Sequence, residues 1–454
     1  MRVKDIKELL KKIEKEDISP YSGRLFAYVY ETGDESIKKI ARDALIQFSE
    51  KNALDFTVFR SAIHFEKEIV GFAKTLMHGD DNVTGSCTFG GTESIFLAVK
   101  SARDVFYKKE GRNLLPEIIV PVTIHPSFYK AADYMGLKIK KVPIDKNRKA
   151  DVEAIKNAVS NKTALIALSA PNWPYGTIDP IKEVAEIALN KNIPLHVDAC
   201  LGGFILPYFE KLGEEVALFD FRVEGVTSIS LDVHKYGYAP KGSSVVLFKT
   251  TEFKKHSIYV DVSSPGYVFV NQAVLSSRSI GPLASAYAVI KYLGNEGYQK
   301  FAQKILSARN KIYNGLRKLG FETVAPVESS VLSLYNENID LLKFVVSMRE
   351  KGWHVPLQRG LKEFGIPLNI HLTISPIHDS VADEFINDSA QAITSPAMVD
   401  MGVFESIKTG NFQKILEDLN AGKVDSAVIP LILDYIPEEI AVELVKEIVI
   451  QWFK

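Results

Sequence analysis

The sequence lacks the features that define several protein classes. Cysteine occurs at two positions, Cys87 and Cys200, which are far apart and have no metal-ligand spacing. This excludes a disulfide framework and is typical of a protein of the reducing cytoplasm, where we expect this chain to work. No run of about 18 apolar residues is present, so we expect no membrane span. The first twenty residues are charged throughout and lack the apolar core of a signal peptide.

The sequence also has no excess of positive or negative charge. The 55 Lys and Arg residues nearly balance the 56 Asp and Glu residues, so nothing favours nucleic acid or an anionic membrane surface as a partner. Hydrophobic residues make up 46% of the chain, which is enough for a sizeable core. Because 454 residues exceed a typical domain of about 100–200, we expect two domains or one large domain with appendages.

Three regions of the chain differ in their pattern of apolar and polar residues. Residues 1–75 read as a polar N-terminal helical segment. In residues 76–290, apolar runs such as "EIIVPV", "ALIALSA" and "PLHVDA" alternate with helical patterns, which predicts βαβ units around a mostly parallel sheet. Residues 291–454 combine long helical patterns with short strands, which predicts a smaller α+β domain. Its tail, "EEIAVELVKEIVIQWFK", is expected to be a helix docked on the body rather than on a membrane, because acidic residues occupy its polar face.

Ligands of such sheets bind beyond the carboxyl ends of the strands, and three sequence features fall there. The first is "TFGGTES". Gly90 and Gly91 allow backbone N–H groups to approach an anion, Thr92 adds a hydroxyl, and a helix begins near Glu93. The alternative is an ordinary turn in which Thr92 caps the helix.

The second feature is Asp198, which closes the strand of "PLHVDACLGGF". A carboxylate next to the core requires a partner. His196 shares a strand face with Asp198, so a metal site is conceivable. No third ligand is evident nearby, and we predict no metal.

The third feature is the pair His234-Lys235 in "ISLDVHKYGYAPKGSS". A lysine in a partly desolvated cleft would have a depressed pKa and act as an amine nucleophile toward a carbonyl. An anion-binding helix start, a strand-end carboxylate and such a lysine together are what pyridoxal 5'-phosphate requires.

The segments "GVTSISLDVHKYGYAPKGSS", "IPLHVDACLGGF" and "GGTESIFLA" resemble those of the sphingosine-1-phosphate lyase branch of the group II pyridoxal-phosphate-dependent decarboxylase family. The resemblance runs from about residue 22 to about residue 410. It implies the PLP-dependent transferase fold of aspartate aminotransferase type I, with a mostly parallel large-domain sheet and a smaller α+β C-terminal domain. It also implies pyridoxal phosphate as the cofactor and a homodimer with shared active sites.

The resemblance assigns roles to residues of the cofactor site. Lys235 would form the Schiff base, Asp198 would pair with the pyridine nitrogen, and His125 would stack on the ring. Capping of the following helix is the alternative role for His125. Within one chain, the cofactor phosphate would be held by Gly91, Thr92 and His234. Across a dimer, it would also be held by Ser277 and Gly281 from the stretch "SSRSIGPLA".

For the substrate site, the resemblance gives both matches and departures. Lys241, Tyr30 and Asn52 match the lysine, tyrosine and asparagine with which the lyase branch binds its substrate's phosphate. The family's histidine is replaced by Asp55 in "NALDFTVF", and a carboxylate there would repel a phosphate. Tyr175 replaces the histidine of a Pro-His-Gly segment. A tyrosine expected after the lysine loop reads as Phe269, with Tyr267 two residues away.

Three functional hypotheses follow. The first is a PLP-dependent carbon–carbon lyase that cleaves a phosphorylated amino alcohol by a retro-aldol step. The second is an amino acid decarboxylase on the same fold, favoured by Asp55, which could recognise a cationic side chain. The third is a non-catalytic protein that keeps the fold, which the combination of Asp198, His125, His234 and Lys235 opposes. In the first two cases the small-molecule substrate carries an amine.

Overall fold

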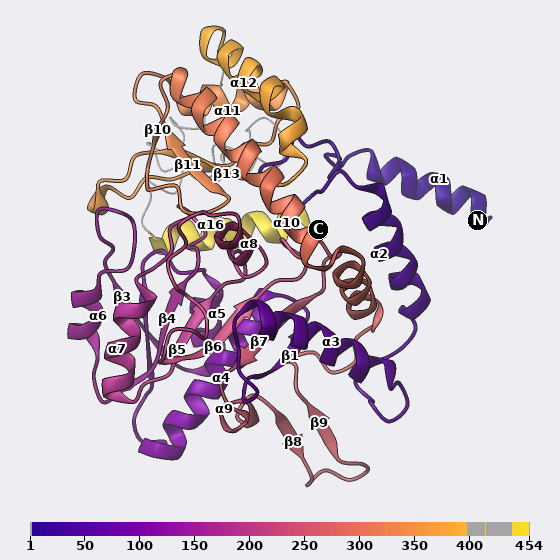
Figure 1. Cartoon of the computed structure of the whole chain (residues 1–454), viewed down its shortest axis with the longest axis vertical. Coiled ribbons are helices and arrows are strands. Elements are labelled where there is room, and N and C mark those ends of the chain that lie inside the picture. The colour runs from indigo at the N-terminus through magenta and orange to yellow at the C-terminus, as the bar shows by residue number, and fades with distance from the viewer. Residues whose placement is uncertain (1, 397–413, 415–437, 454) are drawn as a thin grey trace.

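A seven-stranded sheet lies at the centre of the computed structural model, which describes residues 2–396, 414 and 438–453 (Figure 1). Its strands follow the order β1-β7-β6-β5-β4-β2-β3, and all run parallel except β7. The predicted mostly parallel sheet is therefore confirmed. The strands are β1 (Thr84–Thr88), β2 (Glu117–Pro121), β3 (Lys138–Val142), β4 (Thr163–Ser169), β5 (Leu195–Asp198), β6 (Val226–Leu231) and β7 (Ser244–Phe248).

Helices cover both faces of this sheet because its strands are apolar on both sides. In β2, Ile118 and Val120 belong to the cluster under α4 and α5, whereas Ile119 belongs to the larger cluster on the opposite face. The period of two along a strand produces this division. The helices between the strands are α4 (Gly91–Glu110), α5 (Ser127–Met135), α6 (Val152–Ala158), α7 (Ile181–Lys191) and α8 (Leu206–Lys211), and α9 (Thr251–Lys255) follows β7.

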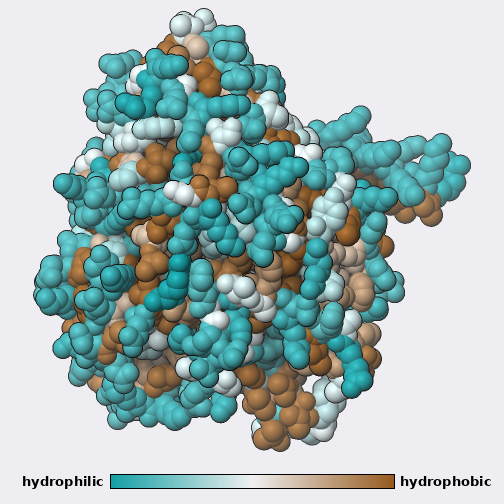
Figure 2. Space-filling model, viewed as in Figure 1, coloured by the Kyte–Doolittle hydropathy of each residue, from teal (hydrophilic) through white to brown (hydrophobic). Residues whose placement is uncertain are grey.

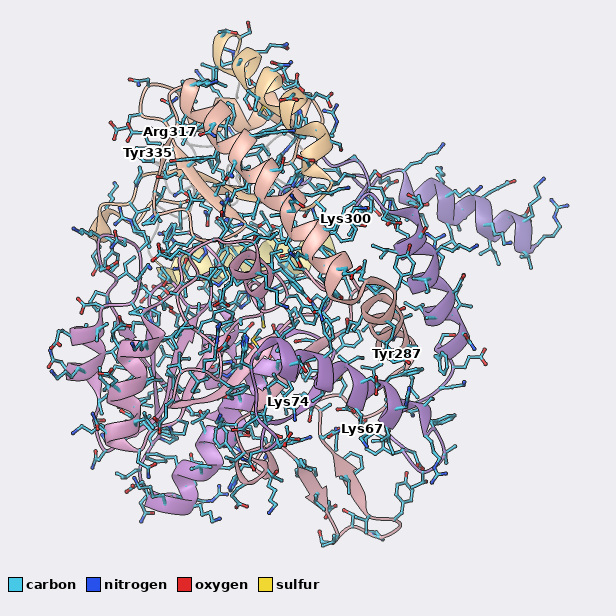
Figure 3. All side chains as sticks on the ribbon, viewed as in Figure 1. Lys67, Lys74, Tyr287, Lys300, Arg317 and Tyr335 are labelled. Atoms are coloured by element: carbon cyan, nitrogen blue, oxygen red, sulfur yellow. The ribbon has the colours of Figure 1, made fainter. Side chains whose placement is uncertain are left out.

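Two of the N-terminal helices, α2 and α3, pack against the long helix α10 (Gly281–Lys318), whereas α1 has no buried residue. Tyr287 of α10 lies beside the third helix, where its ring is 5.1 Å from that of Phe65 (Figure 3). Gly294 has φ 53° and divides α10 into two helical parts. The predicted domain boundary after residue 290 falls within the first part. The N-terminal helices are α1 (Val3–Glu14), α2 (Glu35–Phe48) and α3 (Ser61–Leu76).

The smaller C-terminal unit contains a four-stranded antiparallel sheet of order β10-β11-β13-β12. The N-terminal segment joins it: Leu25 bridges to His354, and the Phe26 carbonyl accepts the N–H of Thr373 at 2.8 Å. Residues 397–413 and 415–437 of the predicted domain lie outside the described residues. The elements are β10 (Glu322–Thr323), β11 (Val331–Tyr335), α11 (Leu341–Glu350), β12 (Leu357–Gln358), the 3₁₀ helix η1 (Lys362–Phe364), β13 (Asn369–Thr373) and α12 (His378–Thr394).

The C-terminal helix α16 (Glu438–Trp452) is docked on the body, as predicted, through buried Leu444 and Ile448 of the main core. Within the described part of the chain, no helix is both long and apolar enough to cross a bilayer.

A β-hairpin, β8 (Tyr259–Asp261) and β9 (Phe269–Asn271), projects from the large domain and carries exposed apolar side chains (Figures 1 and 2). Val262 is 76% exposed and Tyr267 is 86% exposed. The hairpin forms its own two-stranded sheet. A pair of strands this short is marginally stable in water, so its apolar surface calls for an explanation.

Candidate functional site

A cavity of about 650 Å³ opens at the carboxyl ends of β1, β5 and β6. It has the size and position expected for the ligand site of a parallel α/β sheet. The sheet therefore brings together residues that are about 145 positions apart in the sequence. The predicted cofactor residues that line it are Gly91, Thr92, His125, Asp198, His234 and Lys235.

The N-terminus of α4 forms one wall of this cavity. The helix begins at Gly91 with Gly90 at the N-cap, and no side chain caps it, so the alternative in which Thr92 is the cap is wrong. Thr92 Oγ1 instead lies 2.8 Å from Ser127 Oγ at the start of α5. A Cβ on Gly91 would lie 2.8 Å from Cys200 Sγ and 2.9 Å from Asp232 Oδ2, so the close packing here requires glycine. Free N–H groups at a helix start are suited to an anion.

His125 contacts the start of α5 and also lines the cavity. Its Nδ1 accepts the backbone N–H of Ser127, the first residue of α5, at 3.2 Å. The ring also lines the cavity and lies edge-on to Trp173, with 6.2 Å between centroids. Burial lowers the pKa of His125 despite the opposing charge of Asp198. The imidazole is therefore neutral at neutral pH.

Asp198 is the last residue of β5 and faces the cavity. Its Oδ1 accepts the Cys200 N–H at 3.0 Å and the Ser230 hydroxyl at 3.3 Å. His196, considered above as a metal ligand, is instead held between the hydroxyls of Ser228 and Ser230. Among the described residues no group of three His, Cys, Asp or Glu side chains could hold a metal ion.

Lys235 forms a buried ion pair that the sequence analysis missed. Its Nζ lies 3.0 Å from Oδ2 of Asp232, which is 2% exposed. Burial alone would lower the pKa of Lys235, but the Asp232 carboxylate outweighs it and raises the pKa above its usual value. The expected depressed pKa is therefore wrong for this state of the site. The signal was present: Asp232 closes the buried run "SISLD" just as Asp198 closes "LHVD".

A second cavity of about 780 Å³ adjoins the first, and both are lined by His125, Trp173 and Lys235. The predicted substrate residues Tyr30, Tyr175 and Lys241 line it. Burial raises the pKa of Tyr175 to about 12, so its hydroxyl stays protonated at neutral pH.

Lys241 is an exposed residue whose ammonium nitrogen lies 5.1 Å from the centre of the Tyr30 ring. The same nitrogen is 3.3 Å from the His234 carbonyl oxygen, to which it donates. Desolvation of the ammonium and the nearby charge of Lys235 lower the pKa of Lys241 to about 8. Lys241 thus places a titratable positive charge in the wall of the second cavity.

Four predicted site residues do not line either cavity of their own chain: Asn52, Asp55, Ser277 and Gly281. Three of them lie together, because Asn52 Nδ2 donates to Ser277 Oγ at 3.3 Å and Asn52 bridges to Ser279, two residues before Gly281. Asp55 is exposed and its Oδ1 accepts the Thr57 hydroxyl at 2.6 Å and the N–H groups of Thr57 and Val58 in its own turn. These hydrogen bonds lower its pKa.

Comparisons with known proteins agree on the family. The profile of the pyridoxal-dependent decarboxylase conserved domain matches residues 3–333. Sphingosine-1-phosphate lyase of Arabidopsis thaliana is 37% identical over 397 residues, which span 85% of this chain and 72% of the plant protein. A probable L-tyrosine/L-aspartate decarboxylase of Methanothermobacter thermautotrophicus is 31% identical over 320 residues, spanning 70% of this chain and 85% of that protein.

The structural comparison agrees with the sequence comparisons. A sphingosine-1-phosphate lyase from Burkholderia pseudomallei K96243 matches with a TM-score of 0.82 and 30% identity, covering 92% of this chain and 95% of that chain. The predicted aspartate aminotransferase type I fold and the dependence on pyridoxal phosphate are confirmed. The chain therefore belongs to the pyridoxal-dependent decarboxylase family and is a pyridoxal-phosphate-dependent lyase.

Proposed function

We propose that this enzyme cleaves a carbon–carbon bond of a phosphorylated amino alcohol by a retro-aldol reaction, as a sphingosine-1-phosphate lyase does. The observation that carries the proposal is the position of Lys241 over the Tyr30 ring, in a cavity that shares Lys235 with the neighbouring cavity. A lysine ammonium is a suitable partner for a phosphate. Lys241 lies on the side of the site where the substrate phosphate would point away from the reacting carbon.

The first cavity fits pyridoxal phosphate. The N-terminus of α4 with Gly91 and Thr92 would hold the phosphate, helped by His234, and Lys235 would hold the aldehyde carbon. Asp198 would keep a proton on the ring nitrogen, and His125 would lie against the ring. When bound, the cofactor supplies an electron sink that stabilises negative charge on the substrate carbon that bears the amine.

The protein's own groups would handle the protons. The Lys235 amine lies at the cofactor cavity and would donate or accept a proton there, and the Asp232 carboxylate, 3.0 Å away, would stabilise its charged form. Trp173 and Leu201, which line both cavities, would exclude water from the junction.

We further propose a homodimer in which each chain completes the other's site. Asn52, Ser277 and Gly281 lie near one another but away from the cavities of their own chain. Val274 and Leu275, which shortly precede Ser277, are exposed at the rim of the first cavity. The apolar β8–β9 hairpin precedes them in the chain. A second copy would cover this surface and receive Asn52, Ser277 and Gly281 in its own site.

The direct test is a reaction of the purified, PLP-loaded protein with sphingosine 1-phosphate. We expect release of phosphoethanolamine and a long-chain aldehyde, and loss of both products in Lys235→Ala. Failure to release either product, by protein that still shows Schiff-base absorbance, would reject this substrate while leaving the cofactor assignment intact.

Amino acid decarboxylation is the second candidate, favoured by the 31% identity to the probable L-tyrosine/L-aspartate decarboxylase. Its test is carbon dioxide release from tyrosine, aspartate and basic amino acids by the same preparation. Basic amino acids are included because of Asp55. The two reactions are distinguished by their products, since only decarboxylation releases carbon dioxide.

A further inference from the structure

Four polar side chains form a compact array inside the sheet, behind the cavity. The parallel pairing of β5 and β6 places His196 opposite Ser228 and Asp198 opposite Ser230. Because alternate residues of a strand share a face, all four side chains lie on the same side of the sheet. His196, Ser228 and Ser230 have no exposed surface, and Asp198 is 7% exposed. Buried polar groups in an apolar sheet need hydrogen bonds, and here they bond to one another.

The hydrogen bonds form one chain from Ser228 to Asp198. Ser228 Oγ lies 2.9 Å from His196 Nδ1, and His196 Nε2 lies 3.1 Å from Ser230 Oγ. Ser230 Oγ lies 3.3 Å from Asp198 Oδ1, which also accepts the Cys200 N–H at 3.0 Å. Both hydrogen bonds to the carboxylate go to Oδ1, and among the described residues none reaches Oδ2.

The carboxylate fixes the direction of every hydrogen bond in the chain. An ionised Asp198 only accepts, so the single hydroxyl proton of Ser230 is donated to it. The Ser230 oxygen must then accept from His196, which requires the proton on Nε2. Nδ1 of His196 then carries no proton and accepts the Ser228 hydroxyl. The opposite tautomer would leave two acceptor oxygens facing each other at 3.3 Å in a buried site.

We propose that Ser228, His196 and Ser230 form a one-way hydrogen-bond relay that positions the Asp198 carboxylate, with Oδ2 free for the cofactor ring nitrogen. His196 and Ser230 are thus positioning residues that act through Asp198. This role rests on the proposed pairing of Asp198 with the ring nitrogen. Burial lowers the pKa of His196 to about 4, which agrees with the neutral ring that the relay requires.

The relay predicts graded effects on the cofactor. Ser230→Ala removes a hydrogen bond to a charged group, which should weaken pyridoxal phosphate binding about tenfold. Ser228→Ala is the matched control, because it makes the same change at an equally buried position of the same strand, two hydrogen bonds further from Asp198. His196→Gln keeps a side-chain N–H donor, whereas His196→Leu does not. We therefore expect Gln to retain more cofactor affinity than Leu.

The experiment combines titration of each apo variant with pyridoxal phosphate and nitrogen NMR of cofactor labelled with ¹⁵N in the ring. We expect the signal of a protonated ring nitrogen in the wild type and a shift toward the unprotonated position in Ser230→Ala and His196→Leu. A variant that merely loses stability would keep the wild-type signal in its folded fraction.

Three results would overturn the relay. One is an unchanged affinity and ring signal in Ser230→Ala, and another is an equal loss in Ser228→Ala. Detection of His196 with its proton on Nδ1, by histidine-specific ¹⁵N NMR, would also overturn it. That measurement does not depend on the cofactor. A wild-type protein that binds pyridoxal phosphate without a protonated ring nitrogen would instead reject the role proposed for Asp198.

Discussion

Asp232 Oδ2 and Lys235 Nζ form an ion pair 3.0 Å long at the floor of the cofactor cavity. The other oxygen of Asp232, Oδ1, is buried and has no hydrogen-bond partner among the described residues. A buried carboxylate with one satisfied oxygen holds the lysine as an ammonium. A lysine must lose its proton before it attacks an aldehyde, so this pair controls how fast the cofactor is attached.

The first prediction concerns that rate. Asp232→Asn removes the charge that raises the pKa of Lys235, while burial, which lowers the pKa, remains. Below that pKa, each unit by which it falls increases the neutral amine about tenfold. We expect the apo variant to form the Schiff-base absorbance at least tenfold faster at pH 7. Asp220→Asn, at a buried carboxylate paired with Arg222, is the control and should leave the rate unchanged. An unchanged rate in Asp232→Asn would contradict the prediction.

The second prediction concerns stability in acid. Burial lowers the pKa of His196, His371 and His378 to about 4, compared with 6.5 when unfolded. Between these values the unfolded chain binds more protons, so stability should be full above pH 6.5 and fall as the pH falls toward 4. Each histidine contributes on the order of 3 kcal/mol to that fall.

Urea unfolding of the apo protein between pH 4 and pH 7 checks this slope. His378→Gln should make the slope shallower, because one of the buried titrating histidines is gone. His378 lies away from both cavities, where its ring accepts the Ser375 N–H, so cofactor binding does not enter the comparison. A slope equal to that of the wild type would show that His378 is not neutral in the folded state.

The third prediction compares two adjacent glycines. A Cβ at Gly91 would lie 2.8 Å from Cys200 Sγ and 2.9 Å from Asp232 Oδ2, whereas at Gly90 the nearest contact is 3.4 Å, to His234. Overpacking typically costs about 1–3 kcal/mol. We expect Gly91→Ala to weaken pyridoxal phosphate binding about tenfold or more, and Gly90→Ala to have a clearly smaller effect. Titration of the apo proteins by absorbance measures both, and equal losses would argue against the tight packing under Gly91.

Much of this fold could be predicted from the sequence because its signals are local. The apolar runs that became β2, β4 and β5 are short, uninterrupted and flanked by helical patterns. The insertion of β7 between β6 and β1 could not be predicted, because its pairing with β1 joins residues about 160 positions apart. Nor does any local pattern indicate that Leu25 bridges to His354 in the smaller domain.

The site shows the same limit. The sequence placed Asp198 and Lys235 at strand ends, and the sheet brings both to one cavity. The protonation of Lys235 was predicted wrongly because burial was weighed without Asp232, three residues earlier. The protonation state of a buried charged group depends on its nearest charged partner. That partner is known only once the conformation of the turn after the strand is known.

The fourth prediction concerns substrate phosphate. Lys241→Met should raise KM for a phosphorylated amino alcohol at least tenfold, since a hydrogen bond between charged groups is lost. An amino alcohol without phosphate should show little change, and it serves as the control. With a pKa of about 8, Lys241 loses its charge as the pH rises, so KM of the wild type should increase above pH 8 while that of Lys241→Met should not. Parallel pH profiles would exclude Lys241 as the phosphate partner.

The last prediction tests the shared site by mixing two inactive variants. Lys235→Ala removes a residue that lines its own cavity, whereas Asn52→Asp with Ser277→Asp places negative charge on the surface proposed to enter the partner's site. Each homodimer should be inactive, but a mixed dimer has one cavity with intact Lys235, Asn52 and Ser277. Random reassortment should recover about a quarter of wild-type activity, because half of the dimers are mixed and each has one complete site. If each site used residues of a single chain, every cavity in the mixture would stay defective and no activity would return.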